Sequence, residues 1–165
     1  MVLKKLTHQQ PVMKNIYHPP DFDEIISRIN KLTPDSQRRW GKMSVNEMIC
    51  HITDQMRLAI DEKKTQYPFN PVVQFFGKMM FVYGFRFPKN FLTVREMKQS
   101  PNGDGTRPVN FRRDLESLIH VLNEFVSKDK NYSFSSHPAF GQMNRKEWGI
   151  MVYKHLDHHL RQFGV

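Results

Sequence analysis

Three histidines in this sequence have the side chains and the spacing to bind one metal ion. His155 and His159 are four residues apart near the end of the sequence, and His51 lies far upstream. On a helix, residues four apart stack on the same face, about one turn apart. Two neutral imidazoles so placed can coordinate one divalent ion, and a third from a neighbouring helix would complete a facial triad with open positions. The pattern therefore predicts a reactive rather than a purely structural metal site.

Other potential ligands lie close to these three in the sequence. His158 is three residues from His155 and could share the same ion, but helical projection places it nearer the flank of the helix. We therefore expect it to surround the site or to face solvent. Cys50 precedes His51, yet the turn of a helix aims it about 100° away, so we expect a small buried hydrophobe there. The remaining histidines have no partner at a useful spacing and are expected at the surface: His8, His18, His120 and His137.

The sequence marks a catalytic base less clearly. Asp54 lies one turn beyond His51 and could orient that imidazole or act as a general base. It could equally be a carboxylate on the helix surface, paired with Arg57. Leu156 stands where the glutamate of a His-Glu-x-x-His motif would be, so the pattern is not that of a zincin metalloprotease. The base must then come from elsewhere, or be a hydroxide held by the metal.

The histidines have to be positioned by helices, and the first half of the sequence predicts two. Each has an apolar residue every three or four positions and begins with a capping box, in which a polar side chain and an acidic one cap the first turn. The first helix is expected from the N-cap Asp21 to Pro34. The second is expected from the pair Ser44 and Glu47 to about Lys63, and it carries the upstream histidine.

The second half of the sequence predicts two more amphipathic helices. The third follows Pro108, and the fourth begins at a capping box of Asn144 and Glu147 and continues to Phe163, with Gly164 as its C-terminal cap. The fourth helix places two histidines on its inward face, where a helical bundle ordinarily has leucine. Burying unpaired imidazoles is unfavourable, which favours a metal. Strand-like alternation is nowhere sustained, so the fold class is predicted to be all-α.

A long crossover separates the second and third predicted helices. Its first part predicts an extra short helix after Pro71. The segment Phe75–Phe91 is rich in phenylalanine and could form the wall of a substrate pocket, a membrane-surface patch or a dimer face. Because its apolar residues have helical spacing, packing into the core is the interpretation we favour. The sequence Asn102–Gly105 predicts a plain surface turn rather than a phosphate-binding loop.

Length and composition indicate the number of domains, the cellular location and the class of partner. With 165 residues, the chain is expected to form a single domain, residues 1–165, in which 1–19 are an N-terminal extension. One cysteine and the lack of a signal-peptide or membrane-spanning pattern predict a cytoplasmic protein. The net charge of +9 is spread over short, scattered basic pairs. We therefore expect a solvated basic surface, with neither specific nucleic acid nor a membrane as partner.

Two motifs resemble those of the DinB/YfiT-like metalloprotein superfamily. The stretch Trp40–Asp54 has a tryptophan, a serine-capped helix and a His-hydrophobic-x-Asp element, which is similar to the first family motif. The stretch His155–Gln162 is similar to the second, in which histidines at i and i+4 complete the site. The run from His137 to Phe163 resembles one uncharacterised branch of the superfamily. The resemblance covers roughly residues 20–65 and 135–165, and the middle of the chain is unmatched.

The resemblance implies a four-helix bundle of DinB/YfiT type with the long crossover between helices 2 and 3. It also implies one divalent ion, nickel or zinc, held by His51, His155 and His159, and it implies homodimers. Related proteins include thiol-dependent S-transferases and isomerases, and metal-dependent hydrolases. The expected function is thus a metalloenzyme acting on a small-molecule substrate, with a thiol as one candidate. The alternative is a non-catalytic metal-binding bundle with a binding or stress-response role.

Overall fold

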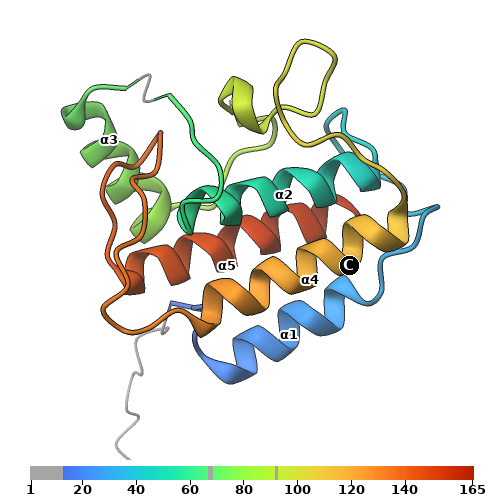
Figure 1. Ribbon diagram of the computed structural model, residues 1–165, viewed down its shortest axis with the longest axis horizontal. Coiled ribbons are helices and arrows are strands. Elements are labelled where there is room, and N and C mark those ends of the chain that lie inside the picture. The colour runs from blue at the N-terminus through green and yellow to red at the C-terminus, as the bar shows by residue number, and fades with distance from the viewer. Residues whose placement is uncertain (1–12, 67–68, 92) are drawn as a thin grey trace, which may run out of the picture.

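Four long helices lie side by side in this protein (Figure 1): α1 (Pro19–Ile29), α2 (Val45–Ala59), α4 (Phe111–Ser127) and α5 (Arg145–Gln162). The computed structural model describes residues 13–66, 69–91 and 93–165. Within these residues the regular elements are all helical, with no strand. The predicted all-α fold class is therefore confirmed.

The crossover between α2 and α4 contains three shorter elements. They are α3 (Pro71–Lys78), the π-helix η1 (Met79–Gly84) that continues directly from it, and the single 3-10 turn η2 (Arg95–Met97). The extra helix predicted after Pro71 is thus present. Lys154 on α5 holds the end of η1, because its ammonium group donates to backbone carbonyls that include those of Val82 and Phe85. This contact anchors the crossover to the helix that carries two of the three histidines.

The helix ends follow the capping signals in two cases out of three. Two of the three predicted capping boxes form, that of Ser44 at the start of α2 and that of Asn144 at the start of α5. The prediction of Asp21 as the N-cap of α1 is wrong, because α1 begins at Pro19 and His18 occupies the N-cap position. Prolines fit the first turn of a helix, where their missing N–H has no intrahelical acceptor. Asp21 instead accepts a hydrogen bond from the backbone N–H of Asn15.

The C-terminal ends differ from the prediction for α2 and agree with it for α5. Helix α2 ends at Ala59, short of the predicted Lys63, because the chain turns at Asp61, which adopts a φ of 69°. Helix α5 ends at Gln162, and Gly164 follows with a φ of 84°, as expected for a left-handed C-terminal cap.

Helix α5 is the central helix of the fold. It packs against α1, α2 and η1, so side chains all round it are buried rather than a single stripe. The predicted inward residues Trp148, Val152 and Leu156 are among those fully buried. Full burial of side chains of this size contributes about 1.5–3 kcal/mol each to folding. Because α5 is covered on several sides, His158 and His159 are buried and His155 is partly buried.

Helix α3 does not pack as the sequence predicted. Core packing is the wrong interpretation for it, since Phe75 and Phe76 are 55% and 62% exposed. The side of α3 that faces the domain is polar: Gln74 donates to the Pro138 carbonyl, and Lys78 pairs with Glu147. Further along the segment, Phe81, Phe87 and the wholly buried Val82 do pack against the core. No helix in the described part of the chain has the length and apolar character needed to cross a membrane.

Candidate metal centre

The three predicted ligands meet in the interior between α2 and α5. The Nε2 atom of His155 lies 3.2 Å from Nε2 of His51 and 3.1 Å from Nε2 of His159. Candidate ligand atoms of all three lie within 4.8 Å of one another. The predicted convergence of these side chains is therefore confirmed. The local cause is simple for α5, where four residues make one turn, and the packing of α2 on α5 supplies the third ring.

Hydrogen bonds at the far side of two rings set their tautomers. His51 Nδ1 lies 2.9 Å from the Met97 carbonyl oxygen, and His159 Nδ1 lies 2.8 Å from Gln162 Oε1. Both partners are acceptors, so we assign the proton to Nδ1 in each ring. The two Nε2 atoms are then unprotonated, and their lone pairs point into the shared space. This is the arrangement in which histidines commonly bind metals, with the outer nitrogen donating to a carbonyl.

The position of Gln162 is itself fixed. Its amide nitrogen donates to the Trp40 carbonyl at 2.9 Å, so its oxygen must face His159. Gly41 makes this approach feasible: it has a φ of 78°, and a Cβ atom there would lie 2.5 Å from the Gln162 amide nitrogen. The turn before α2 thus supports a ligand on α5.

The spacing of the three nitrogens fits a single ion. Ligands 2.0–2.1 Å from a tetrahedral ion are separated by about 3.3 Å, close to the two distances observed. The third ring is less constrained, because His155 Nδ1 is buried with no hydrogen-bond partner among the described residues. Without an ion, a proton on His155 Nε2 can be donated to Nε2 of only one of the two neighbouring rings, His51 or His159. The lone pair of the remaining ring then has no donor. A cation in the shared space removes this conflict.

Burial also keeps the imidazoles neutral. It lowers the pKa of His51, and it lowers the pKa of His159 well below its ordinary value. The pKa of His155 is likewise well below its ordinary value, first because of burial and then because of the neighbouring imidazoles. Metal ligation requires neutral imidazole, so the site is in its binding-competent protonation state at neutral pH.

His158 and Cys50 lie beside the site without joining it. Of the two positions expected for His158, around the site or facing solvent, its burial supports the first and contradicts the second. Its ring packs edge-on against Trp40 and Phe87, with ring centres 5.8 and 6.2 Å away. Cys50 is buried as predicted, and burial raises the pKa of its thiol to about 12, so it is not a thiolate nucleophile.

Asp54 is buried and pairs with Arg57. It is 0% exposed, so it is not a surface carboxylate, but the expected pairing is present, with 4.0 Å between an Arg57 guanidinium nitrogen and a carboxylate oxygen. Its hydrogen bonds do not go to the histidines, and its role as a general base stays a prediction. The hydrogen bonds go to the crossover instead. One oxygen accepts from the Thr106 hydroxyl, and the other accepts from the Thr106 N–H and from the side chains of Gln99 and Lys63. His51 is oriented by a backbone carbonyl in the same crossover, so Asp54 supports the site through the chain that it anchors.

Sequence reasoning missed the two groups that orient the ligands. Gln162 could have been found, because it lies three residues after His159 and therefore on the same face of α5. The role of the Met97 carbonyl could not have been predicted from the sequence, because every residue type supplies a carbonyl. Only the path of the crossover brings this one to His51. The turn Asn102–Gly105, which follows Met97, was predicted to be a plain surface turn. Instead Gly103 and Gly105 are buried, and a Cβ at either would collide with the Lys98 backbone.

His137 was expected at the surface and is buried. Its ring stacks on Phe140 with centres 4.4 Å apart and lies 5.6 Å from the Trp148 ring. Its Nδ1 accepts the Ala139 N–H, which identifies it as a neutral imidazole. His18 and His120 are exposed as expected, and His8 lies outside the described residues.

The burial of His137 predicts a loss of stability in acid. Burial lowers the pKa of His137 to about 3, from an unfolded value near 6.5. Below pH 6.5 the unfolded chain therefore binds a proton that the folded protein excludes, and the free energy of unfolding falls as the pH drops toward 3. This histidine alone should lower it by about 2 kcal/mol between pH 7 and pH 5.

Urea unfolding at a series of pH values checks this expectation. His137→Phe keeps the stacked ring and should make the dependence on pH shallower by that amount, whereas His120→Phe at an exposed site should leave the dependence unchanged. Equal dependence in the wild-type protein and His137→Phe would show that His137 does not exclude the proton.

A cavity of about 600 Å³ lies between α1, α5 and η1. Its lining includes Glu24, Tyr83, Tyr153, Lys154 and Arg161, but none of the three histidines. The residues that α5 contributes to it are on the opposite side of the helix from His155 and His159. This cavity therefore does not provide a substrate pocket for the histidine cluster.

A family model described as "Protein of unknown function (DUF1569)" matches residues 12–164. No curated protein and no solved structure matches the chain. The family match spans both helices that carry the three histidines.

Proposed function

The chain belongs to the DUF1569 family, and we propose from the geometry of its histidine cluster that it is a divalent-metal-dependent enzyme. The ion, nickel or zinc, would be held by His51, His155 and His159. The reaction would be hydrolysis or thiol-dependent transfer on a small molecule. The observation that carries the proposal is the meeting of three Nε2 atoms, two of them with lone pairs directed inward by hydrogen bonds at Nδ1.

The residues of the chain would leave part of the ion's coordination sphere open. Three neutral imidazoles fill one side, and no carboxylate or thiol joins the cluster among the residues that the structure describes. When bound, such an ion lowers the pKa of a coordinated water or thiol toward neutrality and so supplies a nucleophile. His155 is only partly buried, so reactants would approach from its side. Phe87, whose ring lies 6.2 Å from that of His155, would make this approach apolar.

Two observations favour the non-catalytic alternative, a metal-binding bundle with a binding or stress-response role. The 600 Å³ cavity is separated from the histidines by α5, and Asp54 is fully engaged with the crossover. A catalytic site is expected to combine a concave pocket with a vacant coordination position. The two functions therefore differ in whether a metal-bound protein turns over a substrate.

We also propose that the arrangement of the helices is of the DinB/YfiT type. The support is the order of the elements: two long helices, a crossover with a short extra helix, and two more long helices, with ligands on the second and the last. A cytoplasmic location fits the same proposal, since the single cysteine, Cys50, would stay reduced there.

The test combines metal analysis with activity. Protein purified without an affinity tag should contain about one nickel or zinc ion per chain. It should hydrolyse an activated ester or amide, or transfer a thiol such as glutathione to an activated acceptor. Chelation should abolish turnover, and the restored metal should bring it back. Metal without turnover on any of these substrates would support the non-catalytic alternative, and protein that binds neither metal would refute both.

Replacing Gln162 should weaken metal binding without removing a ligand. Gln162→Leu keeps much of the volume but loses the acceptor for His159 Nδ1–H, so the His159 ring is no longer held in its binding orientation. Loss of such a supporting hydrogen bond lowers metal affinity by roughly 10–100-fold. Competition with a chromophoric chelator measures the change. Gln37→Leu, at an exposed position, is the matched control, and an equal affinity for Gln162→Leu and the wild-type protein would contradict the assigned role.

A further inference from the structure

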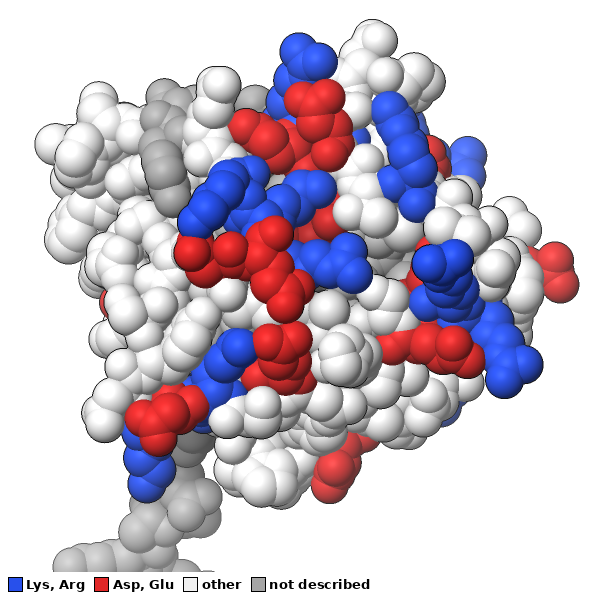
Figure 2. Space-filling model, in the orientation of Figure 1, with Lys and Arg blue, Asp and Glu red and all other residues white. Residues whose placement is uncertain are grey.

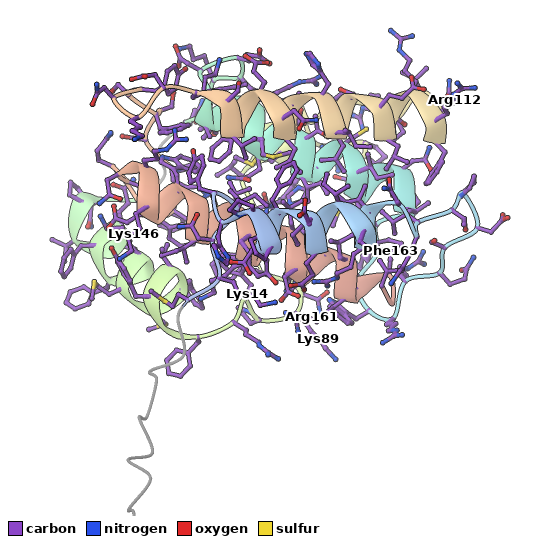
Figure 3. All side chains as sticks on the ribbon, turned by 90° about the horizontal axis from the view of Figure 1, so that it is seen from below. Lys14, Lys89, Arg112, Lys146, Arg161 and Phe163 are labelled. Carbon is purple, nitrogen blue, oxygen red and sulfur yellow. The ribbon has the colours of Figure 1, made fainter. Side chains whose placement is uncertain are left out.

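Helix α3 carries its apolar side chains outward. We call this surface the α3 apolar face, and define it as six exposed residues: Val72, Val73, Phe75, Phe76, Met79 and Met80. Phe85 extends it beyond η1 with 72% exposure. In Figure 3 aromatic side chains project outward from the green helix at the left. Monomeric soluble proteins rarely expose so many large apolar side chains together without a binding role.

The outward orientation is held by specific contacts and is not a loosely packed core. Gln74 donates to the Pro138 carbonyl, and Lys78 contacts both the Gln142 carbonyl and the Glu147 carboxylate. Between them, Gly77 lets the helix approach the domain closely, since a Cβ there would lie 3.0 Å from the Ala139 carbonyl oxygen. The polar side of this amphipathic helix is thus fixed inward, and its apolar side must face outward.

Every charged residue along this part of the chain is basic. From Lys63 to Arg95 the sequence has no aspartate or glutamate. Within the described residues, Arg86 and Lys89 are exposed and have no carboxylate partner. Figure 3 shows Lys89 at the lower edge of the molecule, along which α3 and η1 run. The upper left of Figure 2, where α3 lies, shows neither basic nor acidic side chains. Arg86 follows Phe85 directly in the chain and so borders this end of the apolar surface, whereas Lys89 lies further along the lower edge, with its ammonium group 4.9 Å from the centre of the Trp40 ring.

We propose that the α3 apolar face docks this protein on a lipid bilayer that contains anionic lipids. A helix whose large apolar side chains lie on one face can rest in the interfacial plane with that face among the acyl chains. Arg86 and Lys89 would then lie at the level of the headgroups, where each cation adds electrostatic attraction. This departs from the expectation that no membrane is a partner, because composition does not show which side of α3 faces outward.

The positive charge of this surface argues against a second copy of the chain as the partner of the α3 apolar face. A symmetric dimer through this face would bring the same surface of two chains together, and with it the exposed Arg86 of each chain. Like charges placed together at an interface oppose association. The net charge of +9 adds to this repulsion between copies, whereas it favours approach to an anionic bilayer.

The experiment is binding to vesicles by the full chain. Vesicles of phosphatidylcholine alone are compared with vesicles that also contain phosphatidylserine, and bound protein is measured by co-sedimentation. We expect stronger binding to the mixed vesicles, weakened by added salt. The double variant Phe75→Ser with Phe76→Ser should bind about tenfold more weakly or worse. Arg86→Glu with Lys89→Glu should lose about fivefold or more for each cation.

Matched controls separate the proposed face from the rest of the surface. Val109→Ser removes an exposed apolar residue elsewhere, and Arg112→Glu with Arg113→Glu makes the same change of charge on α4. Both should bind vesicles much as the wild-type protein does. Circular dichroism checks that all variants fold, which is expected because the replaced side chains are exposed. If Phe75→Ser with Phe76→Ser nevertheless unfolds, Val72→Ser replaces it.

Two results would overturn the proposal. One is the absence of binding to the mixed vesicles, or binding that the α3 variants and the controls weaken equally. The other is a homodimer, seen by light scattering, that dissociates in Phe75→Ser with Phe76→Ser while vesicles bind neither form. The second result would identify the face as a contact between copies of this chain.

Discussion

His155→Ala and His159→Ala are each expected to abolish binding of a divalent ion. Each removes one of three imidazoles whose candidate ligand atoms lie within 4.8 Å of one another, and two neutral ligands hold an ion poorly. The loss should exceed the roughly 10–100-fold that follows from removing a supporting hydrogen bond. Titration with nickel or zinc against a chromophoric chelator measures it directly.

Two other histidines provide the controls. His158→Ala should weaken binding less, if at all, because that ring packs on Trp40 and Phe87 outside the cluster. His120→Ala at the exposed surface of α4 should have no effect. Stability of the metal-free protein need not fall with affinity, since alanine also removes the unfavourable burial of an imidazole. A larger loss of affinity in His158→Ala than in His155→Ala would mean that the ion lies on a different face of α5.

Asp54→Asn is expected to lower the free energy of unfolding by about 3 kcal/mol. The Asp54 carboxylate is fully buried and accepts from Thr106 and Gln99 as well as from the Lys63 ammonium group. Removing one partner of a buried ion pair typically destabilises by 3–5 kcal/mol. We expect the lower end, because the Lys63 side chain is 19% exposed and keeps some hydration. Urea unfolding of the metal-free protein measures the change.

Asp54→Asn should also lower the affinity of the histidine cluster for a metal ion. Asp54 holds the chain on both sides of the turn that follows Met97, whose carbonyl orients His51. A less firmly held crossover would orient His51 less well, so metal affinity should fall while all three ligands remain. Asp61→Asn, which changes an exposed carboxylate paired with Lys64, is the control and should alter neither property strongly. A loss of stability below about 1 kcal/mol in Asp54→Asn would show that its partners are satisfied by water instead.

Features that depend on near neighbours in the chain could be predicted from the sequence alone. The capping boxes at Ser44 and Asn144 and the left-handed cap at Gly164 need only a few adjacent residues, and all three form. The pairing of His155 with His159 is of the same kind, because one helical turn places them together whatever else surrounds the helix. The all-α fold class follows from the same periodicity.

What each helix face contacts could not be predicted, because it depends on how the helices pack. Periodicity shows that a face is apolar or polar but not what covers it, so α3 was expected to be buried and exposes its phenylalanines. The burial of Asp54 and of His137 was not predicted for the same reason, since their covering partners come from the crossover and from the loop before α5. The orientation of His51 depends on the Met97 carbonyl, a group that every residue carries. The path of the chain, and not the residue type, brings that carbonyl within hydrogen-bond distance.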